Sequence, residues 1–286
     1  MIELFSITFF ALILEYLSIK TYDAYQYSPD FIFQFGNIPD NVPVVIAFAW
    51  AIIIGTSMKI SDISNVSNKT KPFLDTLLAL TIDLSMDVIA IRIDAGLWNW
   101  KIGISNSITF DSFIGVRYGN FIGWYFIVLI YSVLIRYGRG KYQNNEYAYS
   151  GYLSMIPLLG LIPFYIIFDI IQQGKRIFNY SPYFMIVVII LIYYAVNQVF
   201  TSLQNHENKN VTHQSDNLMR IELVAYYSFH IFFLMAFFAL KLYQSAPLIV
   251  IPSVLAILIH IFSHYLFIVK SETSKRTFFR NFSLGR

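Results

Sequence analysis

The sequence predicts an all-α fold: a polytopic integral membrane helix bundle. Hydrophobic residues occupy 57% of the 286 positions and charged residues only 13%, about half the charged fraction of an average soluble domain. The mean hydropathy is +0.57. Eight apolar stretches are long enough, or nearly so, to cross a bilayer as helices, which takes about 20 residues each. These observations indicate about eight transmembrane helices in one domain.

The predicted spans follow one another with short polar connections. The first begins at Ile2 without the basic segment and cleavage site of a signal peptide, so we expect it to be retained. The second is the shortest. The last two are separated only by a tight turn at 244–247, which predicts an antiparallel hairpin. The eight stretches are 2–19, 42–58, 72–98, 119–137, 152–172, 182–203, 219–243 and 247–269.

Lysine and arginine placement predicts the orientation of the bundle. With eight spans, thirteen of these residues fall on one side and six on the other, and Arg92 lies inside a span. Because cytoplasmic loops carry the excess of basic residues, both termini are expected in the cytoplasm, with the protein in the plasma membrane. We expect residues 1–270 to form one transmembrane domain and 271–286 a basic cytoplasmic tail, which acts more as an orientation signal than as a lipid-binding segment.

The composition also excludes several classes of function. The formal net charge of +3 is small and scattered, which does not suit nucleic-acid binding. The chain has no cysteine, so thiol catalysis, disulfides, iron–sulfur clusters and thiolate metal sites are excluded.

Charged residues interrupt the third span, whose sequence from 83 to 100 is DLSMDVIAIRIDAGLWNW. Asp83 and Asp87 are four residues apart and therefore share a helix face. At a rise of 1.5 Å per residue they lie about 17 and 22 Å into the span, and Glu15 lies about 20 Å into the first. Trp50 is expected at a comparable depth. Charged groups at such depth usually face the bundle interior and mark a functional site.

This arrangement suits acid catalysis on an alkene. Two neighbouring carboxyl groups in a low-dielectric site cannot both ionise easily, so one keeps its proton beside an ionised partner. Such a pair is a proton donor with a built-in base, and surrounding aromatic rings could stabilise a carbocation. The alternative is a buried polar network that only fixes helix packing. We favour that alternative for Arg92, paired with Asp94 or Asp87.

Four blocks of the first 126 residues resemble a membrane family of carotenoid biosynthesis. They read ILEYLSIKTYDAYQYS, NVPVVIAFAW, DLSMDVIAIRIDAGLWNW and FIGVRYGNFIGW. The characterised members of that family are carotenoid 1,2-hydratases of the bacterioruberin and γ-carotene pathways. This sequence departs from the family pattern at Val88 and Arg117, where the family has proline, and in a longer polar loop from Lys101 to Ser112.

The resemblance implies hydration of a terminal double bond of an acyclic carotenoid, without a metal or a redox cofactor. Asp83 or Asp87 would protonate the alkene, and the other aspartate together with Glu15 would place the water. The implied substrate-binding residues are Tyr25, Tyr27, Trp50, Trp98, Asn120 and Trp124. Asn120 could instead serve the start of its helix, and Trp100 is assigned to an interfacial aromatic belt. Expected partners are a hydrophobic polyene, the lipid bilayer and other carotenoid-pathway membrane enzymes.

Three other hypotheses remain open. An intramembrane prenyltransferase would use the Asp-x-x-x-Asp pair to bind Mg²⁺ and a diphosphate, but Asp62, Asp75 and Asp111 are isolated in the sequence and form no second motif. A proton-coupled transporter could use paired acids as a relay, although no inverted repeat is evident. Finally, His260 and His264 on one helix face, with His230 nearby, could bind a metal, but a satisfied buried pair is the favoured interpretation.

Overall fold

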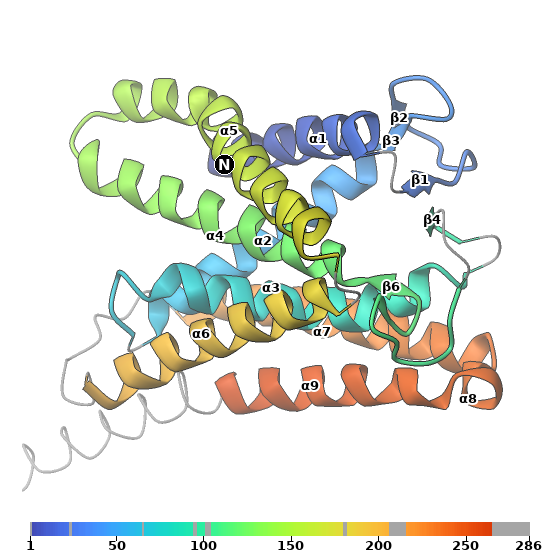
Figure 1. Cartoon of the computed structure of the whole chain (residues 1–286). Helices are drawn as coiled ribbons and strands as arrows, with labels where there is room; N and C mark the ends of the chain where they lie inside the picture. Colours follow the sequence, from blue (N-terminus) through green and yellow to red (C-terminus); the bar gives the residue numbers. More distant parts are fainter. Residues whose placement is uncertain are drawn as a thin grey trace, which may run out of the picture.

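Eight helices of 15 or more residues make up most of the described part of the chain in the computed structural model (Figure 1). The structure describes residues 2–22, 25–64, 66–93, 96–100, 104–179, 182–205 and 216–264. The long helices are α1 (Ile2–Tyr22), α2 (Val44–Ile63), α3 (Lys71–Ala90), α4 (Tyr118–Lys141), α5 (Glu146–Phe178), α6 (Tyr183–Asn205), α7 (Asp216–Ala239) and α9 (Val250–His264). The short helices α8 (Leu242–Ser245) and η1 (Pro247–Ile249) join the last two.

Five of these helices, α1, α2, α4, α5 and α6, are long and apolar enough to cross a membrane. Helix α3 has 20 residues but is not among the five, because it carries Asp75, Asp83 and Asp87. The described apolar parts of the last two long helices are shorter, at Val224–Ala239 and Pro247–Ile259. The fold is therefore that of a helical membrane protein, as the composition predicts.

Helix α3 lies at the centre of the bundle. It packs against α2, α4, α6, α7 and α9, with α1, α4 and α5 on one side of it and α6 and α9 on the other (Figure 1). Both Asp83 and Asp87 are consequently buried, with exposed fractions of 0% and 3%. The surrounding helices rather than lipid solvate these acids, which agrees with the prediction that they face the bundle interior.

The fold departs from the all-α prediction at one end of the bundle, where three short strand pairs lie (Figure 1). Strand β1 (Tyr25–Tyr27) pairs antiparallel with β4 (Trp98–Trp100), β2 (Gln34–Phe35) with β3 (Val42–Pro43), and β5 (Ser112–Phe113) with β6 (Val116–Arg117).

The predicted third span, 72–98, is longer than helix α3 because its last residue already belongs to a strand. Helix α3 ends at Ala90, eight residues before the expected end, since Trp98 already belongs to β4. The chain turns after Ile91, and Gly96 has a φ of +96°, in the region that favours glycine. The backbone of β4 is then satisfied by β1 rather than by a helix.

A network of ion pairs joins four helices near the end of α4 that is distant from the strands. Arg136 pairs with Asp62 and, at 2.9 Å, with Asp75. Arg139 pairs with Asp62 at 2.8 Å and with Glu3 at 2.6 Å. These contacts tie α1, α2, α3 and α4 together. Asp62 and Asp75, which are isolated along the sequence as predicted, therefore belong to one ion-pair network in the fold.

Candidate active site

Glu15, on α1, accepts three hydrogen bonds from aromatic side chains. The indole Nε1 of Trp50 donates to Oε1 at 2.7 Å, and the hydroxyl of Tyr27 donates to Oε2 at 2.9 Å. The hydroxyl of Tyr25 also donates to Oε2. Three hydrogen-bond donors around one buried carboxyl group favour its ionised form, because a carboxylate accepts hydrogen bonds more strongly than a neutral acid does. Both tyrosines and Trp50 were predicted site residues, and the structure brings them together on Glu15.

The two tyrosines reach Glu15 because of the strand on which they lie. Successive side chains of a strand point to opposite faces, so Tyr25 and Tyr27 share one face. Burial, and next the nearby Glu15 carboxylate, raise the pKa of both phenols well above the ordinary value of 10.0. The hydroxyl groups therefore keep their protons and remain hydrogen-bond donors at any physiological pH.

Asp83 and Asp87 form a pair that shares a side-chain amide. The Nδ2 of Asn120 donates to both oxygens of Asp83, at 3.0 and 3.2 Å, and to Oδ2 of Asp87 at 2.8 Å. The shared amide holds the two carboxyl groups beside each other. Two neighbouring carboxyl groups away from water cannot both ionise easily, so the structure has the proximity on which the prediction of one retained proton depends.

Asn120 contacts the acids of the site and does not cap its own helix. It is the third residue of α4, whose N-cap is Arg117, and that cap makes no side-chain hydrogen bond. The amide of Asn120 is committed to the two aspartates instead of to the helix start.

Two cavities meet at these acids. The larger has a volume of about 420 Å³ and lies among α1, α4 and α5, and the smaller has about 220 Å³ and lies between α2 and α7. Glu15, Asn120, Trp50 and Trp124 line both, whereas Asp87 lines only the smaller. The residues shared by the two cavities are Glu15, Tyr25, Trp50, Trp100, Asn120 and Trp124.

Aromatic rings form the walls between and around the cavities. The rings of Trp50 and Trp124 lie 4.0 Å apart between centroids. Trp98 lines the smaller cavity, with its ring centroid 6.0 Å from that of Tyr27. Every predicted site residue except Asp83 therefore lines a cavity, and Asp83 accepts hydrogen bonds from Asn120, which lines both.

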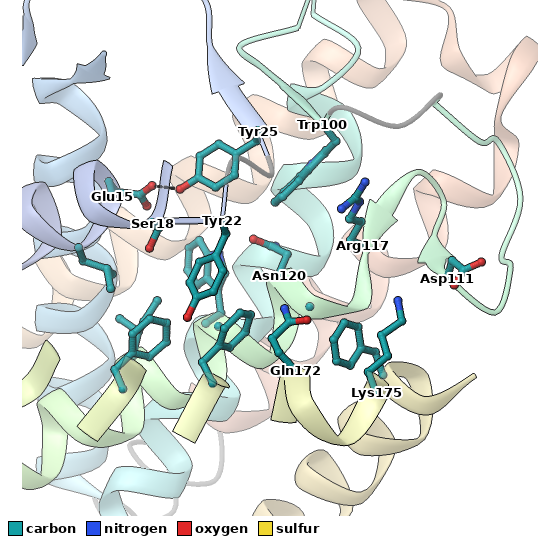
Figure 2. Close-up of a pocket in the computed structure, with 18 of the residues that line it drawn as sticks. Glu15, Ser18, Tyr22, Tyr25, Trp100, Asp111, Arg117, Asn120, Gln172 and Lys175 are labelled. Carbon is teal, nitrogen blue, oxygen red and sulfur yellow. Dashed lines mark hydrogen bonds between the residues drawn. The ribbon is translucent and has the colours of Figure 1, made fainter. Parts of the chain in front are cut away.

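Sequence reasoning misassigned Trp100 and missed the far side of the larger cavity. Trp100 is not at an exposed interface: it is 7% exposed and stacks near Tyr25, with ring centroids 5.0 Å apart. Figure 2 shows Arg117, Gln172 and Lys175 across the larger cavity from Glu15, with Asn120 and Trp100 between them. The alternation in WNW suits a strand, but three residues are too few to separate a strand from a helix end without the partner strand β1.

Arg92, the other charged candidate of the third span that the structure describes, lies outside this site. Arg92 donates to the backbone oxygens of Val88, Ser105 and Ile114 and to the side chain of Asn106, not to Asp87. Its second predicted partner, Asp94, lies outside the described residues. The carbonyl oxygens at the end of α3 and in the following loops thus solvate this guanidinium.

The predicted histidine pair cannot be placed fully. The side chains of His260 and His264 lie outside the described residues, whereas the buried His230 makes a hydrogen bond of 2.9 Å from Nδ1 to the hydroxyl of Ser85. Within the part of the chain that the structure describes, no group of three or more histidine, aspartate or glutamate side chains is arranged to hold a metal ion.

Comparison with known proteins agrees with the resemblance of the first 126 residues. A family model described as carotenoid biosynthesis protein matches residues 1–193, which include every site residue predicted from the sequence. No curated protein and no solved structure matches the chain. Since the match covers about two thirds of the sequence and contains α1 to α4 with both cavities' acids, the chain belongs to the family of carotenoid biosynthesis proteins.

Proposed function

We propose that this protein adds water to a terminal carbon–carbon double bond of an acyclic carotenoid or related isoprenoid. The observation that carries the proposal is the buried pair of Asp83 and Asp87, bridged by Asn120, near Glu15 and the junction of two cavities with aromatic walls. A carboxylic acid, an ionised carboxylate and ring faces are the groups that alkene hydration needs. Membership of a carotenoid biosynthesis family supports a polyene as the substrate.

In the proposed reaction the carboxylic acid of Asp87 gives its proton to one alkene carbon. The electron pair of the double bond forms the new C–H bond, and the neighbouring tertiary carbon becomes a cation. The lone pair of water then forms the C–O bond, and the extra proton leaves the oxygen for a carboxylate, either Glu15 or the aspartate pair. The sum is one water added per double bond, and one proton returns to the site.

Asp87 is the favoured donor because it lines the smaller cavity, whereas Asp83 lines neither cavity. Asp83 then acts as a positioning residue, which is held beside Asp87 by the side-chain amide of Asn120 that both carboxyl groups share. Glu15 is the favoured base, since its three donors stabilise it as a carboxylate that can orient water. The rings of Trp50 and Trp124 are available to stabilise the cation.

The remaining features of the proposal concern the membrane. We expect all eight long helices to cross it, with both termini in the cytoplasm and with residues 271–286 as a cytoplasmic tail. In this topology the strands and the mouth of the larger cavity face the outer side of the plasma membrane. Labelling of single cysteines introduced at exposed Lys20 and Tyr147 should therefore distinguish the two sides, since the wild-type chain has no cysteine.

The test is expression in a host that makes an acyclic carotenoid, with mass spectrometry for products heavier by one water. The wild-type protein should form that product, and Asp87→Asn should reduce its rate by about 10²- to 10⁴-fold, the usual contribution of a general acid. Asp75→Asn is the matched control, because it removes a buried acid of the same helix that lies outside both cavities. Product is measured per amount of folded protein.

Two outcomes would contradict the proposal. The first is a well-folded wild-type protein that forms no water-gain product from any acyclic polyene. The second is an Asp87→Asn variant that keeps the full rate. Loss of activity on chelation of magnesium would instead favour the prenyltransferase alternative. In that case Asn120 would have to turn its side-chain oxygen toward the metal. Proton-driven flux in vesicles would favour a transporter.

A further inference from the structure

The two cavities differ in the chemistry of their linings. Away from the acids, the smaller cavity is lined by apolar residues of α2 and α7, including Val45, Ala49 and Phe233. The larger cavity has polar groups along its length, from Ser18 and Tyr22 near Glu15 to Arg117, Gln172 and Lys175 on the far side (Figure 2). The larger cavity also has apolar walls, from Leu14, Phe164 and Phe168 among others, but its polar groups make it the better suited of the two to water.

A buried donor at the junction has no partner within the described residues. The Nε1 of Trp100 is fully buried and makes no hydrogen bond there, although an unpaired buried N–H group is costly. Trp100 lines both cavities and belongs to the rigid β1–β4 pair. Because Trp100 lines the larger cavity, a small movement of its ring would let an oxygen atom there accept from this donor while the carboxylate of Glu15 accepts from the same molecule.

We propose that the two cavities divide the reactants: the isoprenoid end enters through the smaller cavity, and water reaches it through the larger cavity, where the Trp100 indole N–H holds it. This inference rests on the proposed hydration and specifies its geometry. The alkene would meet the proton of Asp87 inside the smaller cavity. Water would arrive from the opposite side of Glu15, so that the hydrocarbon does not have to pass the charged groups of the mouth.

Filling each cavity with one bulky apolar side chain tests the division. Ala49→Phe fills the smaller cavity, and Gly123→Leu fills the larger one. Gly123 is well suited, because a Cβ atom placed there meets no atom within 4 Å, and leucine favours a helix more than glycine does. Trp100→Phe is the third variant, since it keeps an aromatic ring against Tyr25 but lacks the N–H donor.

The readout separates proton transfer from water capture. In D₂O the acid delivers a deuteron to the alkene, and the cation then either captures water or loses a proton and returns the alkene with deuterium in it. Membranes containing each variant and an acyclic polyene are therefore analysed for both the water-gain product and deuterium in the recovered polyene. Bound polyene is measured in parallel from the quenching of tryptophan fluorescence.

We expect Ala49→Phe to weaken polyene binding by at least about tenfold, as steric pocket changes do, and to abolish both deuterium exchange and product. Gly123→Leu should keep polyene binding and deuterium exchange while the product falls by a similar factor. Trp100→Phe should behave like Gly123→Leu, with a smaller loss of about five- to tenfold for one hydrogen bond.

The outcomes are distinguishable from failure of the proposed function. A wild-type protein that gives neither product nor deuterium exchange overturns hydration itself. A wild-type protein that gives product, combined with loss of polyene binding in Gly123→Leu but not in Ala49→Phe, leaves hydration standing and overturns the division of reactants. Equal loss of exchange and product in Trp100→Phe would show that this tryptophan only supports the structure of the site.

Discussion

Glu15→Gln is the substitution that most directly tests the hydrogen bonding of the site. Glutamine has the shape of glutamate but offers one oxygen and one NH₂ group. Trp50 can only donate, so the amide oxygen must face its Nε1, which lies 2.7 Å from Oε1 in the wild-type chain. The NH₂ group then faces Tyr25 and Tyr27, whose hydroxyl groups can turn and accept. All three contacts survive, but none is charge-assisted.

The magnitude follows from these three bonds. A hydrogen bond to a charged group contributes about 1.5–3 kcal/mol and a neutral one about 0.5–1.5 kcal/mol, so each bond loses about 1 kcal/mol. Three bonds give a loss of about 3 kcal/mol. At about 2–4 °C per kcal/mol for chains near this size, the apparent melting temperature should fall by about 6–12 °C. The water-gain rate should also fall, by about 10²- to 10⁴-fold, because the base is lost.

The assay combines thermal unfolding in detergent at a fixed heating rate with the product measurement in membranes. Trp50→Phe is introduced alone and together with Glu15→Gln to complete a double-mutant cycle. The two substitutions should be coupled by about 1 kcal/mol, since they remove the same charge-assisted bond. A Glu15→Gln protein that is as stable and as active as the wild type would refute an ionised Glu15, and additive effects would refute its bond to Trp50.

Two further predictions concern regions around the site. Arg136→Met should destabilise the protein by about 3–5 kcal/mol, because Asp75, which is 0% exposed, loses the cation that pairs with it. Adding Asp75→Leu to the same chain should recover much of this stability, as measured by thermal unfolding. The raised pKa values of Tyr25 and Tyr27 give a stability that is full below pH 10 and declines as the pH rises above it, because only the unfolded chain then releases these protons. Melting temperatures measured from pH 8 to 11 should show this decline, and Phe at both positions should make it smaller; an unchanged slope would contradict burial of the phenols.

The acids of the site could be predicted from sequence because they depend on helix geometry. The regular rise and the i, i+4 spacing place Asp83 and Asp87 on one face and Glu15 at the same depth. The structure has all three carboxyl groups at one junction, together with Trp50 and Asn120. Each span crosses the same thickness of membrane. Counting residues from the start of each span was therefore sufficient to place the acids of α1 and α3 at one depth.

The end of α3 and the ion network were not predictable by the same means. Trp98 and Trp100 are as apolar as a helix end, and only their pairing with Tyr25–Tyr27, more than 70 positions earlier, makes them a strand. Arg136 and Asp62 are 74 positions apart, and no local pattern joins them. Such contacts are decided by tertiary packing, which a window of neighbouring residues does not contain.

The pairing of β1 with β4 has a consequence for how homologous sequences can vary. Tyr25 lies opposite Trp100 and Tyr27 opposite Trp98, so one register sets both the donors of Glu15 and the tryptophan walls. A slip of one residue would turn every side chain of a strand to the other face. Insertions or deletions between Ile91 and Trp98 should therefore be rare in active members of the family, whereas the segment between Trp100 and Ser112 lies outside this pairing and should tolerate changes in length.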